Sequence, residues 1–179
     1  MSILKVARMG HPVLRARARA LDPSEVRAAV MQKFIDDMMD TMLEYEGIGL
    51  AAPQVHEGVR LFVAGLDDGQ GKLRVTPFVN PVITPLSDAT AEDWEGCLSI
   101  PDIRGRVPRH AHIRIDALDR KGKPFQMELR DFQARVVQHE TDHLDGVLFF
   151  DRMSTFGSLT FLEEYSRYHR SPGADEEDE

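Results

Sequence analysis

The stretch His139-Glu140-Thr141-Asp142-His143 is an H-E-x-x-H pattern set in residues with helical apolar spacing. On an α-helix, positions i and i+4 lie one turn apart on the same face. The imidazoles of His139 and His143 can therefore hold one metal ion, with Glu140 beside it as a proton acceptor. The five residues alone leave a second interpretation open, in which two surface histidines share a helix face and bind no metal.

Helical spacing also defines the elements around this pattern. The helix that carries it is predicted to cover roughly residues 132–144, and Gly146 is a suitable C-terminal stop. A first amphipathic helix is predicted to begin at residues 22–25, which place Asp at the N-cap, Pro at the first helical position and Glu three residues after the cap. It continues to about Gly47, and a third helix is predicted over about residues 158–168.

The region between the first helix and the metal-binding pattern is predicted to be mostly strand and loop. Pro77, Pro81 and Pro85 favour edges, bulges or short strands over a central strand. Residues 119–122 predict a hairpin turn. The candidate strands are residues 60–64, 75–83, 113–118 and 125–129. Helices separated from a block of antiparallel strands indicate an α+β fold.

Length and composition narrow the class of protein. The chain has 179 residues, which suits one domain, expected over residues 1–170, followed by an acidic tail at 171–179 that we expect to be disordered. The formal net charge of -8 disfavours general affinity for nucleic acid, so we expect no direct DNA binding. No apolar run is long enough for a membrane helix. The single cysteine cannot form an intrachain disulfide, and we expect a cytoplasmic protein.

A catalytic metal usually needs a third protein ligand besides two histidines. Glu163, Glu164 and His169 are candidates downstream. Cys97 is an upstream candidate, because a thiolate is a strong ligand for a borderline cation and the preceding Gly96 permits close approach of the backbone. A lone cysteine can equally be a buried structural residue.

Residues 47–54 are small, apolar and rich in glycine, and they directly follow the first helix. They lack the spacing of a dinucleotide or phosphate loop. They fit either a tight turn into a strand or a cleft wall that pairs with an extended peptide, with Gln54 supplying an amide donor.

These three segments, in this order, resemble the peptide deformylase family. Its motifs G-x-G-x-A-A-x-Q, E-G-C-x-S and Q-H-E-x-D-H are matched without mismatch by residues 47–54, 95–99 and 138–143. The resemblance extends from residues 9–15 to residues 148–152. It implies antiparallel sheets packed around a central metal-binding helix, with an N-terminal amphipathic helix and a C-terminal helix.

The resemblance also implies roles for individual residues. Those matching metal ligands are Cys97, His139 and His143, and Glu140 matches the general base and acid. Gln54 and the backbone N–H of Leu98 match the donors that stabilise an oxyanion. Ile48 and Gly49 match the strand-like wall that pairs with the substrate backbone. The pocket for the methionine side chain would be formed by Ile48, Phe132, Val136 and His139. Arg104, assigned to substrate binding, and Arg109 stand where the family carries arginines, and Asp142 is expected to pair with one of them.

The implied activity is metal-dependent hydrolysis of the formyl group from the N-terminal formylmethionine of nascent polypeptides, with release of formate. The implied cofactor is one divalent ion, Fe2+ in the cell, with Zn2+, Ni2+ or Co2+ able to substitute. Expected partners are N-formylmethionyl nascent peptides and, weakly or transiently, the ribosome, since residues 158–170 lack the basic helix of bacterial relatives. We expect a monomer or a weak dimer. A metallopeptidase built on the same helix pattern and a structural or inactive metal site are the alternatives.

Overall fold

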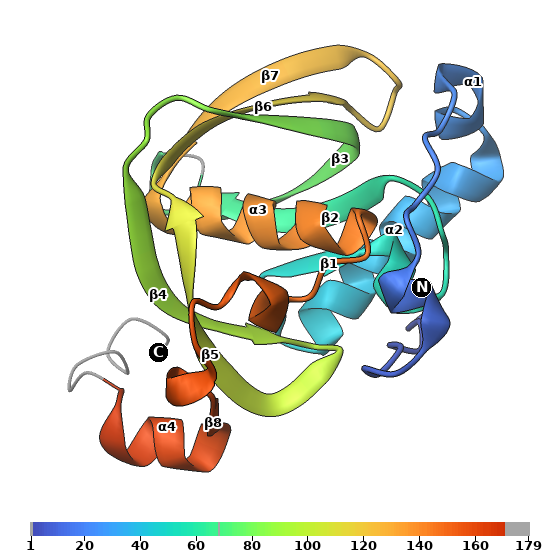
Figure 1. Ribbon diagram of the computed structural model, residues 1–179. Coiled ribbons are helices and arrows are strands. Elements are labelled where there is room, and N and C mark those ends of the chain that lie inside the picture. Colours follow the sequence, from blue (N-terminus) through green and yellow to red (C-terminus); the bar gives the residue numbers. More distant parts are fainter. Residues whose placement is uncertain (1, 68, 171–179) are drawn as a thin grey trace.

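The computed structural model describes residues 2–67 and 69–170 (Figure 1). The acidic tail that was expected to be disordered lies outside these residues. No helix within the described ranges is long and apolar enough to cross a membrane.

The larger sheet has five antiparallel strands in the order β1-β2-β3-β6-β7. Its strands are β1 (Gly49–Ala51), β2 (Leu61–Asp67), β3 (Leu73–Pro85), β6 (His112–Leu118) and β7 (Pro124–Arg130). All four predicted strands are therefore confirmed. The expectation of an edge or short strand at the prolines is wrong, because β3 is a long strand between β2 and β6, but the bulge that they also favoured is present. The strand pairing shifts register between Val79 and Val82. Pro81 lies within this bulge, where its lack of an N–H group leaves no hydrogen bond of the ladder unmade.

A second sheet of three strands was not predicted. It has the order β4-β5-β8 and comprises β4 (Thr90–Cys97), β5 (Ile100–His110) and β8 (Thr160–Phe161). The long β4–β5 hairpin places Cys97 opposite Ile100 at its tight end. Apolar alternation along it is weak, since Glu95 and Arg109 are among its buried side chains. They pair with each other and with Asp142 and Arg135 farther along the chain, so the local sequence gives little sign of this hairpin.

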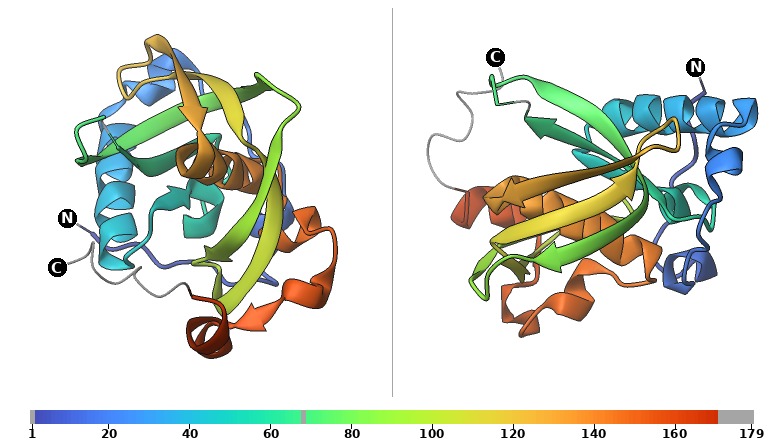
Figure 2. Two further views of the ribbon diagram at one scale, coloured as in Figure 1. Left: turned by 90° about the vertical axis from the view of Figure 1, so that its left-hand side faces the viewer. Right: turned by 90° about the horizontal axis from the view of Figure 1, so that it is seen from above.

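The helix α3 (Asp131–Leu144) begins within one residue of its predicted start and ends as predicted. It lies at the centre of the molecule and contacts strands of both sheets, as Figure 1 and Figure 2 show. Gly146 follows it with φ +74°, and a β-carbon there would lie 2.6 Å from the carbonyl oxygen of Arg15. Only glycine fits this turn without strain. The expected α+β fold, with antiparallel sheets around a central helix, is confirmed.

The other helices depart from the predicted bounds. The first is divided into α1 (Pro23–Val26) and α2 (Ala29–Glu44), because Ala28 is extended with ψ 140°. The last helix, α4 (Leu162–Tyr168), starts later than predicted, because Thr160 and Phe161 pair with β5 instead. Single turns of 3-10 helix complete the structure at η1 (Pro12–Arg15), η2 (Ala52–Val55), η3 (Phe149–Arg152) and η4 (Phe156–Ser158).

Three buried apolar clusters fix the position of α3 and of the strands around it. One joins Val137 and Leu144 of α3 to Phe62, Phe78 and other residues of the larger sheet. A second packs α2 against the opposite side of that sheet. A third joins the cysteine-bearing hairpin to η1 and η3.

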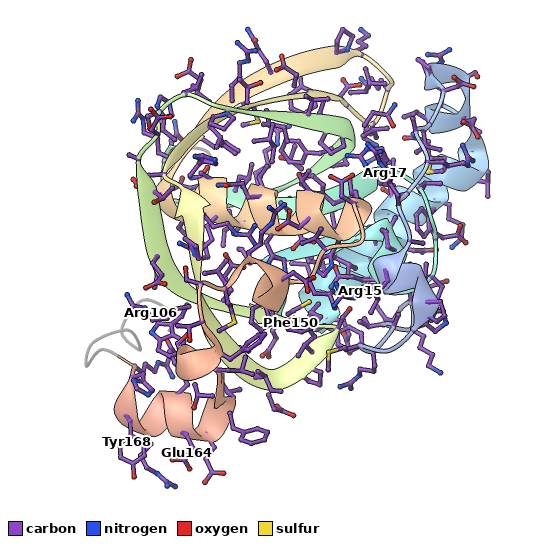
Figure 3. All side chains as sticks on the ribbon, in the orientation of Figure 1. Arg15, Arg17, Arg106, Phe150, Glu164 and Tyr168 are labelled. Atoms are coloured by element: carbon purple, nitrogen blue, oxygen red, sulfur yellow. The ribbon has the colours of Figure 1, made fainter. Side chains whose placement is uncertain are left out.

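The N-terminal segment ties the two sheets together. The amide of Ala7 donates to the carbonyl oxygen of Gln54 at 2.7 Å, and the amide of Met9 donates to that of Ser99 at 2.8 Å. Further along, the guanidinium of Arg15 lies 5.6 Å from the ring centroid of Phe150 (Figure 3). The chain before α1 is thus part of the fold and holds the loops after β1 and β4 in place.

Candidate metal centre and active site

The hairpin end and the central helix bring three metal-ligating side chains together. The ligand atoms of Cys97, His139 and His143 all lie within 4.8 Å of one another, and all three residues are buried. Sγ of Cys97 is 3.3 Å from Nε2 of His143. The interpretation of two surface histidines is therefore wrong, and the cysteine is placed as a ligand would be.

The downstream candidates for a third ligand lie elsewhere. Glu163 and Glu164 both pair with Arg167 on the surface of α4. The ring of His169 packs 5.1 Å from that of Trp94. None of the three belongs to the cluster around the histidine pair.

The donor set fits a divalent transition metal. One thiolate and two imidazoles suit zinc and iron alike, and three protein ligands leave a position open for water or substrate. In addition, Oε2 of Glu140 is buried and makes no hydrogen bond to any residue that the structure describes. Buried carboxylate oxygens almost always have a partner. An ion with its water at this centre would supply one.

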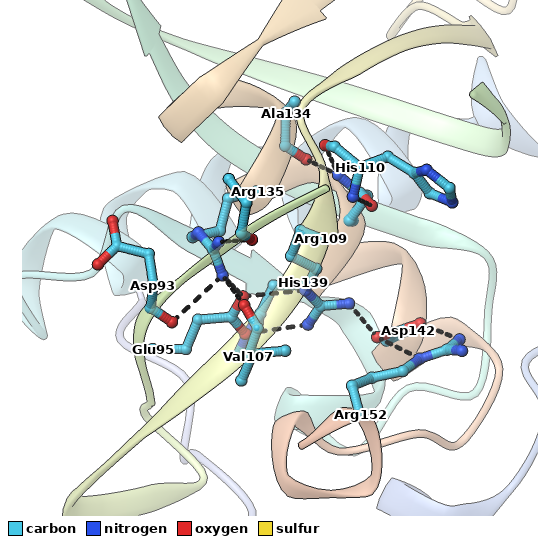
Figure 4. Close-up of polar contacts among 12 residues, drawn as sticks. Asp93, Glu95, Val107, Arg109, His110, Ala134, Arg135, His139, Asp142 and Arg152 are labelled. Carbon is cyan, nitrogen blue, oxygen red and sulfur yellow. Dashed lines mark hydrogen bonds and ion pairs between the residues drawn. The ribbon is translucent and has the colours of Figure 1, made fainter. Parts of the chain in front are cut away.

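Glu95 orients one of the two histidines. Its Oε2 lies 2.9 Å from Nδ1 of His139, which leaves Nε2 of that ring for a metal. The same carboxylate accepts hydrogen bonds from Arg109 at 2.9 Å and from Arg135 at 2.7 Å (Figure 4). Burial alone would raise the pKa of the Glu95 carboxyl, but hydrogen bonds from Arg109 and His139 outweigh it and hold the pKa well below its ordinary value. Glu95 is therefore a carboxylate at neutral pH.

The charged network continues along α3. Asp142, which stands between the two histidines in the sequence, accepts hydrogen bonds from Arg109 and Arg152 (Figure 4). The expectation that Asp142 pairs with Arg104 or Arg109 is confirmed for Arg109. Burial opposes the charge on Arg109, yet the carboxylates of Glu95 and Asp142 raise the pKa of its guanidinium. The network locks the hairpin onto the helix face that carries the ligands.

Glu140 lies against the backbone of β1. Burial raises the pKa of its carboxyl to about 7. A β-carbon on Gly49 would lie 2.7 Å from Cδ and 2.8 Å from Cγ of Glu140. Glycine is therefore required at this position for the glutamate to stand beside the histidines.

Gln54 presents its amide nitrogen to the cysteine. Its Oε1 accepts a hydrogen bond from the amide of Ala51 at 2.8 Å, which fixes the side chain. Its Nε2 is then 3.5 Å from Sγ of Cys97 and 3.3 Å from Oγ of Ser99. The amide is 1% exposed, so its direction is set by protein contacts rather than by water.

The site opens into a cavity of about 740 Å³. Gly96 makes room for Arg104 on its wall, since a β-carbon at Gly96 would lie 2.7 Å from Nε of the arginine. Phe132, which is 60% exposed, stands on α3 at the same cavity. The predicted site residues that line the cavity are Ile48, Gly49, Gln54, Cys97, Leu98, Arg104, Phe132, Val136, His139 and Glu140.

Four residues of the site had no role predicted from the sequence: Arg135, Trp94, Leu162 and Glu95, of which only Glu95 stands in a motif. Arg135 lies one helical turn before His139, and its spacing relative to the histidines was the available signal. Trp94 and Leu162 are far apart in sequence and carry no motif. Both line the cavity because the three-stranded sheet, which was not predicted, carries Trp94 on β4 and brings β8, just before Leu162, against β5.

Comparison with known proteins agrees with this geometry. The pattern of the family described as polypeptide deformylase matches residues 3–158. Peptide deformylase 2 of Nostoc sp. is 39% identical over 168 residues, which span 91% of this chain and 93% of the relative. The peptide deformylase of Fusobacterium nucleatum is 43% identical over 152 residues, which span 85% of this chain and 84% of the relative.

A solved structure shows the same fold. The class I type b peptide deformylase from Acinetobacter baumannii, with Met-Ala-Ser bound, is 34% identical and superposes with a TM-score of 0.78. The match covers 85% of this chain and 99% of that one. The chain therefore belongs to the polypeptide deformylase family, metallohydrolases that remove the formyl group from the N-terminal formylmethionine of new polypeptides.

Proposed function

We propose that Cys97, His139 and His143 hold one divalent metal ion, and that Glu140 and Gln54 carry the deformylase reaction beside it. The observation that supports this most is the convergence of a buried Cys-His-His set with the unpartnered carboxylate oxygen of Glu140. The metallopeptidase alternative is not favoured, because the family match includes the cysteine motif.

Glu140 moves the proton in this proposal. When bound, the metal lowers the pKa of a coordinated water towards neutrality and polarises the formyl oxygen. Glu140 accepts the proton of the attacking water and returns it to the amide nitrogen as the C–N bond breaks. The products are formate and a free N-terminal methionine. The buried carboxyl, with a pKa of about 7, is suited to both transfers at neutral pH.

Gln54 stabilises the negative charge that develops on the formyl oxygen. The hydrogen bond from Ala51 already fixes its amide towards Cys97, so the donor needs no rearrangement during the reaction. The backbone N–H of Leu98, next to the cysteine, is the proposed second donor. Removal of one such donor typically costs about 2.7–4 kcal/mol of transition-state stabilisation.

The peptide binds along the edge of the larger sheet. Since β1 is the terminal strand of this sheet among the described residues, its outer edge at Gly49, next to Ile48, can pair with an extended chain. The methionine side chain enters the apolar part of the cavity between Ile48, Phe132 and Val136, beside the His139 ring. The Met-Ala-Ser held by the Acinetobacter relative is a peptide of the kind that deformylation leaves, which supports this assignment.

The remaining proposals concern the cellular setting. We infer Fe2+ as the ion in the cell from the resemblance to the deformylase family. Zn2+, Ni2+ or Co2+ can substitute, because the Cys-His-His set accepts each of them. The protein acts in the cytoplasm on nascent chains. Its contact with the ribosome is weak or transient, since α4 carries Glu163 and Glu164 in its first turn rather than a basic surface.

The direct test is hydrolysis of formyl-Met-Ala by the purified protein, loaded anaerobically with one equivalent of Fe2+ or Ni2+. We expect release of formate, and no reaction with acetyl-Met-Ala, because a tight site excludes the extra methyl group. Cleavage of the Met-Ala bond would instead support a peptidase. Absence of formate from protein with full metal content would overturn the proposed function.

A further inference from the structure

The C-terminal segment lies against the active-site hairpin. Thr160 pairs with Arg104 and Phe161 with Ile103, so β8 extends the sheet that carries Cys97. The chain then turns into α4, which packs on the hairpin through Trp94. The ring centroids of Trp94 and Tyr165 are 5.0 Å apart at an interplanar angle of 64°. This edge-to-face geometry is a favourable aromatic contact.

The first residue of α4 reaches the substrate cavity. Leu162 and Trp94 both line the cavity that contains Cys97, His139 and Glu140. Leu162 is only half-buried, whereas Tyr168 at the other end of the helix is 69% exposed and points away from the body of the protein (Figure 3). The helix thus adds one apolar side chain to the cavity and keeps its polar face in solvent.

The cavity is larger than a methionine side chain requires. Its volume of about 740 Å³ extends beyond the methionine pocket between Ile48 and Val136. An extended peptide advances about 3.3 Å per residue, and its side chains alternate between two sides. Since the formyl group lies at the metal centre, a chain paired with Gly49 carries its later residues along the cavity away from the metal ligands. Trp94 and Leu162 line the same cavity and offer an apolar wall to such side chains.

We propose that Leu162 and Trp94 form an apolar subsite for a residue that follows the formylmethionine, and that Leu162 determines its preference. The inference rests on the proposed deformylase function and extends it to sequence preference. It also gives α4 a role in substrate recognition. The preferred side chains are large and aliphatic, because the subsite is formed by leucine and an indole.

The test compares three peptides: formyl-Met-Ser-Ser, formyl-Met-Leu-Ser and formyl-Met-Ser-Leu. Wild-type protein should show kcat/KM about tenfold higher for one leucine peptide than for the serine peptide, the usual size of discrimination by one apolar contact. In Leu162→Ala this ratio should fall to about twofold or less, mainly through KM. Phe161→Ala is the matched control, because Phe161 is the adjacent apolar residue, is 66% exposed and does not line the cavity. It should keep the wild-type ratio.

Binding gives a second readout, because Trp94 is the only tryptophan of the chain. Its fluorescence should change when the product Met-Ser-Leu or Met-Leu-Ser binds and change less with Met-Ser-Ser. The unliganded spectrum of Leu162→Ala should match wild type, which shows that α4 is still docked. If it does not match, Leu162→Met provides the folded variant, and its ratio should lie between those of wild type and alanine.

Equal ratios in wild type, Leu162→Ala and Phe161→Ala would overturn the subsite. So would a wild-type preference for serine over leucine at both positions. These outcomes differ from failure of the proposed function, in which wild-type protein hydrolyses none of the three peptides.

Discussion

Gly49 and Glu140 are in direct contact: the backbone of the edge strand β1 lies where a side chain would displace the carboxylate. A β-carbon on Gly49 would lie within 2.7 Å of Cδ and 2.8 Å of Cγ of Glu140. The strand proposed to pair with the peptide and the residue proposed to move the proton are therefore held against each other. Binding of substrate along β1 places it beside that carboxylate.

Gly49→Ala should lower kcat for formyl-Met-Ala by about 100-fold, because a displacement of about 1 Å at a reacting group has an effect of that order. The metal content should remain one equivalent, since no ligand moves. Gly58→Ala is the control, because a β-carbon there meets no atom within 4 Å. A Gly49→Ala enzyme as active as Gly58→Ala would show that the position of Glu140 is not critical.

Glu95→Gln should weaken metal binding by about 10- to 100-fold, the usual effect of losing the partner of a metal-bound histidine. The carboxylate fixes Nδ1 of His139 as a donor, and the amide holds this tautomer less well. Competition with a chelator, followed by metal analysis, measures the change. Unaltered affinity would mean that His139 keeps its orientation without Glu95.

Cys97→Ser should weaken metal binding more strongly than Glu95→Gln, because a neutral hydroxyl replaces a thiolate in direct contact with the ion. Dialysis against buffer without metal should remove most of the ion from the variant and little from wild type. Retention of a full equivalent after dialysis would place the third ligand elsewhere.

Arg109→Ala should destabilise the fold by about 3–5 kcal/mol, because it leaves the buried carboxylates of Glu95 and Asp142 without their shared partner. Urea unfolding of the metal-free protein measures the loss separately from metal binding. Arg114→Ala removes an arginine that pairs with Asp116 at the surface and should cost less than about 1 kcal/mol. Similar losses for the two variants would refute a structural role for the buried network.

The central helix was predictable because one periodic pattern extends from Phe132 to Leu144 and a glycine in the left-handed region follows it. The ligands Cys97, His139 and His143 were identified by motifs whose spacing matches a known family. In the structure these three side chains lie close together, because the end of β4, which carries Cys97, contacts α3, which carries the two histidines.

The β4–β5 hairpin was missed for a physical reason. Its buried positions include Glu95 and Arg109, which pair with each other and also need the charges of Arg135 and Asp142 on α3. A single segment of sequence contains no sign of those partners. The break between α1 and α2 was missed as well, because the apolar spacing continues across Ala28 while its backbone is extended. Long-range pairing therefore determined the β4–β5 hairpin, which local patterns did not predict.

The central claim is that Glu140 moves the proton and does not hold the metal. Glu140→Gln preserves the shape of the side chain and removes the proton acceptor. The measurement is kcat/KM for formyl-Met-Ala together with metal content, on wild type and variant loaded anaerobically with the same ion. We predict one equivalent of metal in both and a loss of at least about 1000-fold in the variant, within the range of general acid–base catalysis. A metal-loaded variant within tenfold of wild type would contradict the account.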